Sequence, residues 1–130
     1  MEIAGLALLA GVIALLFSAY LATSILRQDQ GTEAMQNISR AVREGAMAFL
    51  GREYRTLAVF ALVVTAVLAA VIDWRTAAAY LFGAICSATT GFIGMSIAVR
   101  SNVRTAAAAM KKLNDGLRVA FSSGAVMGFS

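Results

Sequence analysis

The chain has 130 residues, of which 60% are hydrophobic and 14% are charged, with a mean hydropathy of +0.78 and a formal net charge of +4. Soluble domains carry about 25% charged residues, so this composition is typical of a membrane protein. The sequence has no histidine and a single cysteine, Cys86. It therefore excludes His-based catalytic triads, histidine-containing zinc sites, an internal disulfide and Cys-x-x-Cys chemistry within these residues.

The first predicted element is an uncharged run of 24 residues, 3–26. As a helix it would be about 36 Å long, enough to cross a hydrocarbon layer of about 30 Å. A cleaved signal peptide is the alternative, but such peptides open with positive charge and have a shorter apolar core. This run follows Met1-Glu2 and has no clear cleavage site before Arg27. We therefore expect a retained membrane anchor.

The next segment, residues 27–55, predicts a helix that starts at the cap residue Thr32 and continues into the second uncharged run, 56–72. Spacings of three and four place its apolar residues on one face: Met35, Ile38, Val42, Ala46 and Phe49. Arg40 and Glu44 are four residues apart and can meet on the helix surface. The second run has 17 residues, about 25 Å as a helix, and Arg55 and Asp73 at its ends can extend toward the headgroups.

A third uncharged run, 76–99, again has 24 residues. Within it Gly83, Ser87 and Gly91 recur every four residues and predict a groove that a neighbouring helix enters closely. We expect this helix to continue past Arg100 and through the alanine run 106–109. It should end near residues 114–116, where Gly116 is a typical helix terminator.

The final uncharged run, 119–130, has 12 residues and would reach only about 18 Å as a helix. Ala120, Gly124 and Gly128 form a second small-residue stripe there. A helix end inside hydrocarbon would leave its carbonyls without partners, so we expect a longer membrane protein cut within a fourth span. The alternative is a short re-entrant or surface-lying end. The predicted fold is thus all-α, a polytopic helix bundle in one integral membrane domain covering residues 1–130, with spans near 3–26, 56–72 and 76–99 and a truncated span from about 119.

Basic side chains indicate the orientation of the helices. Residues 27–55 and residues 100–118 each carry five, whereas the turn between the second and third spans carries one, Arg75. The positive-inside rule places the two basic segments in the cytoplasm and the N-terminus outside, in a multi-pass protein of the cell membrane. Trp74 and Tyr80 then lie at the outer interface. Because the positive charge is concentrated beside the spans, it indicates this orientation and not nucleic-acid binding.

A search for catalytic motifs finds no GxxxxGK[ST], GxGxxG or GxSxG pattern. The seven carboxylates are isolated, and none lies deep inside a span, where ion-carrying or proton-relaying carboxylates occur. The same absence argues against a small cation or drug exporter. We therefore assign no catalytic, cofactor-binding or metal-binding residue to this chain.

Three sequence blocks nevertheless resemble one family, the membrane-bound, ion-pumping inorganic pyrophosphatases. They are "REGAMAFLGREYRTL" at residues 43–57, "GAICSATTGFIGMSIAVRSNVRTAAAA" at 83–109 and "LRVAFSSGAVMGFS" at 117–130. The blocks occur in the family's order and spacing, and the part "IGMSIAVRSNVRTA" is the most specific. The departures are minor: the alanine run 106–109, and Ser122-Ser123, where family members often have a basic or glycine residue.

The resemblance implies an all-helical homodimer that hydrolyses cytoplasmic pyrophosphate, as its magnesium complex, and moves protons or sodium ions outward. Its aspartate-rich motifs are expected on later helices, so this part would be outer-helix scaffold and inactive alone. Matched charged residues are then expected to form packing contacts and ion pairs at the cytoplasmic rim: Glu44, Arg52, Glu53, Arg100 and Arg104. The alternative from another class is a small three-helix membrane protein that acts as a structural or assembly subunit.

Overall fold

The computed structural model describes residues 2–130, with side chains from residue 4 onward. Four helices make up this part of the chain: α1 (Glu2–Leu26), α2 (Glu33–Val71), α3 (Trp74–Lys111) and α4 (Leu113–Phe129). Within α1, residues Ala4–Leu26, and all of α2 and α3, are long and apolar enough to cross a membrane. The predicted all-α transmembrane fold is confirmed, with three helices that can span a bilayer. The predicted truncated fourth span, and the assignment of the whole chain to one domain, stay predictions.

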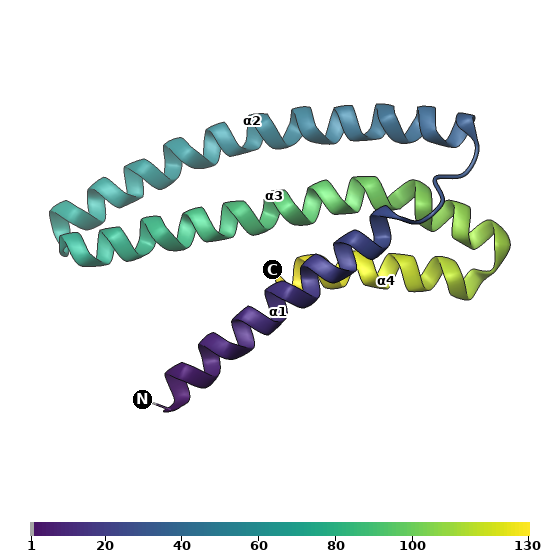
Figure 1. The fold of residues 1–130 in the computed structure, drawn as a ribbon. Helices are drawn as coiled ribbons and strands as arrows, with labels where there is room; N and C mark the ends of the chain where they lie inside the picture. Colours follow the sequence, from purple (N-terminus) through teal and green to yellow (C-terminus); the bar gives the residue numbers. More distant parts are fainter. Residues whose placement is uncertain (1) are drawn as a thin grey trace.

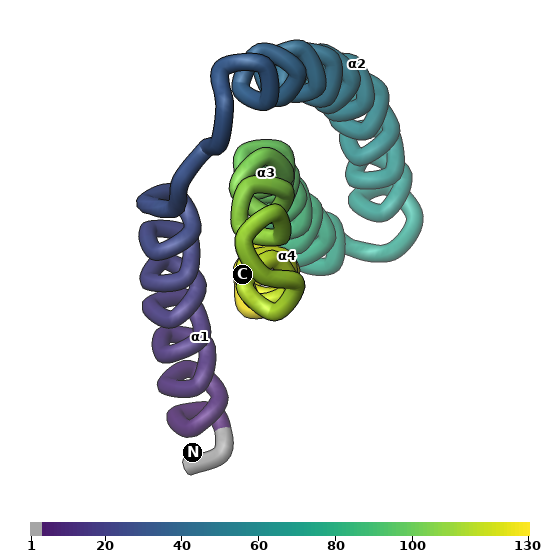
Figure 2. Tube along the Cα trace, turned by 90° about the vertical axis from the view of Figure 1, so that its right-hand side faces the viewer, coloured from purple at the N-terminus to yellow at the C-terminus, as the bar shows by residue number. Residues whose placement is uncertain are grey.

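The helices are arranged around a central pair, α3 and α4 (Figure 1). These two run antiparallel, α2 lies along the opposite side of α3, and α1 crosses α4 obliquely. Figure 2 shows α1 and α2 on either side of the central pair, and within residues 2–130 the two outer helices do not contact each other. The chain thus has a compact junction of α1, α3 and α4, and an arm made of α2 and the start of α3.

The two long helices extend well beyond a bilayer. With 39 and 38 residues, α2 and α3 are each about 57–58 Å long, nearly twice the hydrocarbon thickness of about 30 Å. This confirms the predicted helix that starts after Thr32 and is continuous with the second run, whereas residues 27–32 form the loop before it. The charged residues lie in the part of α2 that precedes its apolar run. α2 therefore begins as a solvated, basic segment and continues into the apolar run.

Side chains cap two of the helix starts. The Thr32 hydroxyl accepts the Met35 amide at 3.4 Å, so the predicted cap of α2 is confirmed. Asp73 caps α3 by accepting the amides of Arg75, at 2.7 Å, and Thr76, at 3.0 Å. A hydrogen bond from the Thr76 hydroxyl, and then these amide bonds, hold the pKa of Asp73 below its ordinary value. Both caps satisfy amides that a helix start leaves without partners.

The predicted end of the third helix was wrong by a few residues. α3 ends at Lys111, and the single extended residue Lys112 connects it to α4. Gly116 does not terminate a helix but lies within the first turns of α4. A Cβ there would approach the Ala109 Cβ to 2.6 Å and the Ala109 Cα to 3.0 Å. Glycine is therefore required at position 116 because the two helices meet so closely after a one-residue turn.

Burial is concentrated where α1, α3 and α4 meet. Ile25, Ile97, Val119 and Val126 form the core cluster, and Val126 has no exposed surface. Two buried serines add hydrogen bonds between helices: Ser101 donates to the Ser123 hydroxyl at 2.7 Å, and Ser18 donates to the Val126 carbonyl at 3.0 Å. By contrast, none of the most apolar 18-residue stretch of α2 is buried. Such exposed apolar surface is expected of helices that contact lipid.

The predicted apolar face of the 27–55 segment is only partly used. Ile38 and Phe49 are 67% and 61% exposed, and Val42 is also exposed, whereas Met35 and Ala46 are half-buried. The residue of α2 that is buried is Leu50, which the predicted face did not include. α2 contacts a single helix, α3, so a narrow stripe is covered and the rest of the apolar face stays open within the described residues.

Candidate functional site

The charged groups of distant segments gather at one end of the molecule. There α1 ends, α2 begins and α3 turns into α4 (Figure 1). We call this region the basic end and define it as residues 24–33 and 100–122. Of the two basic segments, residues 100–118 lie within this region, whereas residues 27–55 begin there and extend along α2. The turn between α2 and α3, with Asp73 and Trp74, lies at the opposite end.

Arg104 connects α3 to the last residue of α1. Arg104 is 7% exposed, and its guanidinium donates to the Leu26 carbonyl at 3.2 Å and to the Arg100 carbonyl at 2.5 Å. The last carbonyls of a helix lack partners and carry partial negative charge, so a cation there is favourable. Burial, followed by the repulsion of Arg100, lowers the pKa of Arg104. The Nε atoms of both arginines are buried without a hydrogen-bond partner in the described residues.

The loop between α1 and α2 is fixed by Asp29. One carboxylate oxygen accepts the Gly31 amide at 2.9 Å, and the other forms an ion pair with Lys111 of α3 at 3.2 Å. Gly31 has a φ of +71°, a left-handed conformation that glycine adopts without strain. The Gly31 hydrogen bond, and then Lys111, hold the pKa of Asp29 below its ordinary value. This loop therefore positions the start of α2 relative to the end of α3.

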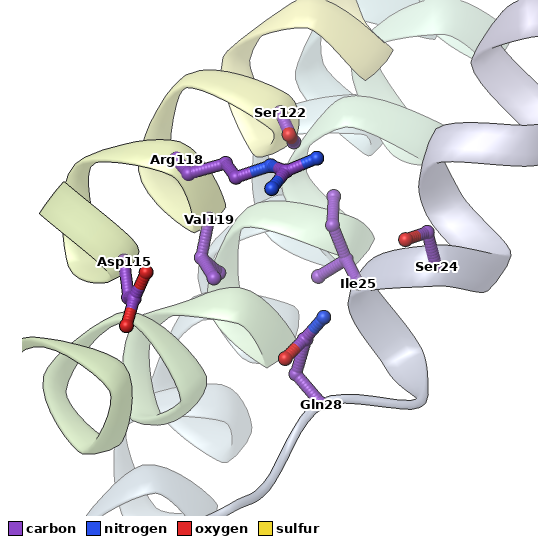
Figure 3. A pocket seen from close by; sticks show the side chains of 7 residues that line it. All are labelled: Ser24, Ile25, Gln28, Asp115, Arg118, Val119 and Ser122. Carbon is purple, nitrogen blue, oxygen red and sulfur yellow. The ribbon is translucent and has the colours of Figure 1, made fainter. Parts of the chain in front are cut away.

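A pocket of ≈ 300 Å³ opens between the end of α1 and the start of α4. Figure 3 shows the side chains that line it, most of which are polar. The full lining is Ser24, Ile25, Gln28, Asp115, Arg118, Val119 and Ser122. In this view Arg118 reaches from α4 toward α1, whereas Asp115 stays beside the first turn of α4. The apolar floor consists of Ile25 and Val119, which are both buried. This pocket is the polar concavity of the basic end.

The predicted ion pairs at the rim do not form within the described residues. Arg40 and Glu44, although four residues apart, are not within 4.0 Å of each other, and neither Arg52 nor Glu53 has an ion-pair partner there. Arg104 does take a packing role, as expected, but through backbone carbonyls and not through a carboxylate. The reason is geometric: α2 contacts only α3 in residues 2–130, so most of its charged face meets solvent.

The predicted groove on α3 is occupied at one of its three positions. Gly91 faces Tyr54 of α2, whose hydroxyl would lie 2.8 Å from a Cβ added at Gly91. That hydroxyl donates to the Ala88 carbonyl at 2.6 Å. Gly83 has nothing within 4 Å of its Cβ position, and Ser87 is exposed. On α4 the stripe at Gly124 and Gly128 is likewise open.

Sequence reasoning missed the glycine and serine contacts that join α3 to α4. A Cβ at Gly94 would come within 2.7 Å of Met127, so glycine allows that side chain to lie across α3. Ser101 and Ser123 form their hydrogen bond in the same interface. No local sequence pattern pairs these residues, because their contacts depend on the register of α4 on α3. That register is set by the turn between the two helices, which was predicted too far along the chain. A turn predicted at Lys112 would have placed Gly94 beside Met127 and Ser101 beside Ser123.

Magnesium ligands were expected elsewhere, and the described residues do not provide a set of them. Among residues 2–130 no three His, Cys, Asp or Glu side chains lie close enough to hold one metal ion. Asp29 is paired with Lys111, and Asp73 is used by the cap of α3. Divalent magnesium needs several oxygen ligands around one point. The described residues therefore contain no such cluster of oxygen ligands.

Comparison with known proteins identifies what the chain is similar to. A family model described as inorganic H⁺ pyrophosphatase matches residues 12–130. The chain is 49% identical over 121 residues to the K⁺-insensitive pyrophosphate-energized proton pump 2 of Moorella thermoacetica, covering 92% of the chain. It is 45% identical over 124 residues, 94% of the chain, to a K⁺-insensitive pyrophosphate-energized proton pump of Methanosarcina mazei. It is 40% identical over 132 residues, 100% of the chain, to a K⁺-stimulated pyrophosphate-energized sodium pump of Thermotoga maritima. In each case the chain spans about 18% of the relative's length.

Proposed function

This chain belongs to the inorganic H⁺ pyrophosphatase family, and from that premise we propose that it supplies the first helices of a pump that hydrolyses cytoplasmic pyrophosphate to move protons or sodium ions across the cell membrane. The observation that carries the proposal is the family match, which covers α2, α3 and α4 and α1 from residue 12 onward. Both proton-pump and sodium-pump relatives match at 40–49% identity, so the proposal includes both ions.

Within such a pump, the role proposed for these helices is scaffold. Two features support it: the carboxylates are dispersed, and the buried arginine, Arg104, is used to cap α1. Hydrolysis of pyrophosphate requires metal ions that neutralise the charge of the diphosphate and activate water. We propose that this machinery, with magnesium and the pyrophosphate substrate, lies in other parts of a homodimeric pump. The chain alone is then inactive.

A segment exchange tests the proposed function. In the Moorella thermoacetica proton pump, the matched 121-residue segment is replaced by the corresponding residues of this chain. We expect the chimera to retain magnesium-dependent pyrophosphate hydrolysis and proton uptake into inverted vesicles. A matched control replaces the same segment with an unrelated three-span segment and should abolish both activities. A chimera that reaches the membrane in normal amounts but neither hydrolyses nor pumps would contradict the proposal and favour a separate structural subunit.

The proposed orientation has an external N-terminus and a cytoplasmic basic end. Both basic segments include residues at the end of the molecule where α2 begins and α3 turns into α4, which supports this orientation because positive side chains are retained in the cytoplasm. Single cysteines at Glu2 and at Gln30 are compared in a Cys86→Ala background, since the native Cys86 is exposed. An impermeant thiol reagent should label position 2 in intact cells, and position 30 only after lysis. Labelling of position 30 but not position 2 in intact cells would reverse the orientation.

A further inference from the structure

The pocket between α1 and α4 contains polar groups that the fold itself does not use. In the described residues, no hydrogen bond or ion pair engages the side chains of Ser24, Gln28, Asp115, Arg118 or Ser122. Some other polar side chains of the basic end do have partners: Asp29 is paired with Lys111, and Arg104 donates to the Leu26 carbonyl. A pocket of ≈ 300 Å³ with five unengaged polar side chains over an apolar floor is suited to a small polar ligand.

The pocket holds one positive and one negative group that do not neutralise each other. Asp115 and Arg118 are three residues apart on α4, a spacing at which opposite charges often meet. They nevertheless form no ion pair within 4.0 Å. Figure 3 shows the reason: the Arg118 side chain extends toward α1, away from the Asp115 carboxylate. Both charges are therefore available, on two sides of the same pocket.

The pocket lies at the depth of lipid headgroups. On the α1 side, Ser24 and Ile25 lie near the end of the uncharged run 3–26, and Gln28 follows Arg27. On α4, Asp115 and Arg118 precede the uncharged run 119–130, and Val119 and Ser122 lie at its start. Both framing helices therefore continue from the pocket into apolar surface, where acyl chains can lie. Basic pockets between membrane helices on the cytoplasmic side can bind lipid headgroups, and this pocket contains Arg118.

From these observations we propose that the α1–α4 pocket binds the zwitterionic headgroup of a phosphatidylethanolamine molecule of the bilayer. Arg118 donates to the phosphodiester, because a guanidinium matches two phosphate oxygens. The hydroxyls of Ser24 and Ser122 complete that side of the site. Asp115 accepts hydrogen bonds from the primary ammonium group. Phosphatidylglycerol has no cation for Asp115, and the quaternary ammonium of phosphatidylcholine has no N–H to donate.

Lipid retention provides the test. The chain is reconstituted into nanodiscs of equal parts phosphatidylethanolamine, phosphatidylglycerol and phosphatidylcholine, and the lipids that remain bound are identified by native mass spectrometry. We expect phosphatidylethanolamine to bind about threefold more tightly than either other lipid, the effect of one or two partly exposed ionic contacts, so that it makes up about three fifths of the retained lipid instead of one third. Retention without enrichment, or enrichment of another lipid, would overturn the proposal. Displacement of the lipid by an excess of inorganic phosphate would also overturn it, since the pocket would then be a site for soluble phosphate.

Two charge variants separate a headgroup site from a merely structural role. Arg118→Gln should abolish the enrichment. Asp115→Asn leaves the pocket with a net positive charge and should transfer the preference to phosphatidylglycerol, a reversal that partial unfolding would not produce. Arg55→Gln is the matched control, because Arg55 is an exposed arginine of α2, away from the pocket. If Asp115→Asn keeps the wild-type preference, or Arg55→Gln has the effect of Arg118→Gln, the proposal is wrong.

Discussion

The junction of α1, α3 and α4 and the arm formed by α2 are held together in different ways. In the junction, a buried core at Val126 is joined by hydrogen bonds between buried serines and by the guanidinium of Arg104. In the arm, the main contacts are the hydrogen bond from the Tyr54 hydroxyl to the Ala88 carbonyl and the buried side chain of Leu50. The most apolar stretch of α2 is exposed. A helix can therefore be apolar enough to span a membrane, lie along a neighbouring helix, and still leave its most apolar stretch unburied within its own chain.

The largest effect is expected where the junction is tightest. Gly116→Ala places a Cβ 2.6 Å from the Ala109 Cβ and 3.0 Å from its Cα, neither of which can rotate away. We expect the free energy of unfolding to fall by about 2–3 kcal/mol, the cost of overpacking. SDS titration of the chain in bicelles, followed by pulse proteolysis, measures it. Gly124→Ala is the control, because position 124 has open space. Equal effects of the two substitutions would show that the contact is not decisive.

A smaller loss is expected when the cap of α1 is removed. Arg104→Met keeps most of the side-chain volume but leaves the Leu26 carbonyl without its donor. Losing one hydrogen bond to a charged donor at a buried position costs about 1–2 kcal/mol. The separation of α1 from α3 can be followed by the distance between spin labels on the two helices. Arg40→Met, at an exposed position of α2, should leave that distance unchanged. An unchanged distance in Arg104→Met would refute the capping role.

In the arm, Tyr54→Phe removes the hydroxyl that donates to the Ala88 carbonyl at 2.6 Å. The expected cost is about 1 kcal/mol, the usual net worth of one hydrogen bond. Because Tyr54 is one of few fixed points between α2 and α3, cross-linking between cysteines at these helices should also become less specific. Gly91→Ala should act in the same direction by displacing the hydroxyl. If Gly91→Ala has no effect on a protein that already carries Tyr54→Phe, the two residues act through one contact, as we expect.

The smallest effect concerns the exposed ion pair that connects the two regions. The pKa of Asp29 is lowered below its ordinary value of 3.8, so its contribution is complete above that pH and is lost as the pH falls through the lower, folded value. A spin label at Gln30 should therefore keep constant mobility from pH 7 to about 5 and become more mobile only below about 4. Asp29→Asn should be more mobile at all pH values. A mobility change near pH 6 would contradict this assignment.

The sequence predicted the elements better than their contacts. Uncharged runs and the Thr32 cap identified helices correctly, because length, charge and capping are local properties. The end of α3 was misplaced because Gly116 is also a common terminator, and its role in close packing depends on which residue lies opposite. The roles of Arg104, Ser101 and Ser123 depend on the register between helices, which no local pattern encodes. The pocket between α1 and α4 likewise joins residues about 90 positions apart.

Phosphate release by the isolated chain tests the central claim most directly, that these helices are scaffold and contain no catalytic centre. The purified chain in nanodiscs and the Moorella chimera are assayed side by side with magnesium and pyrophosphate. The account predicts turnover by the chimera and none above background by the chain, because its described carboxylates form no group that could hold the metal ions. Magnesium-dependent phosphate release by the chain alone would contradict the account and place catalytic groups in these helices.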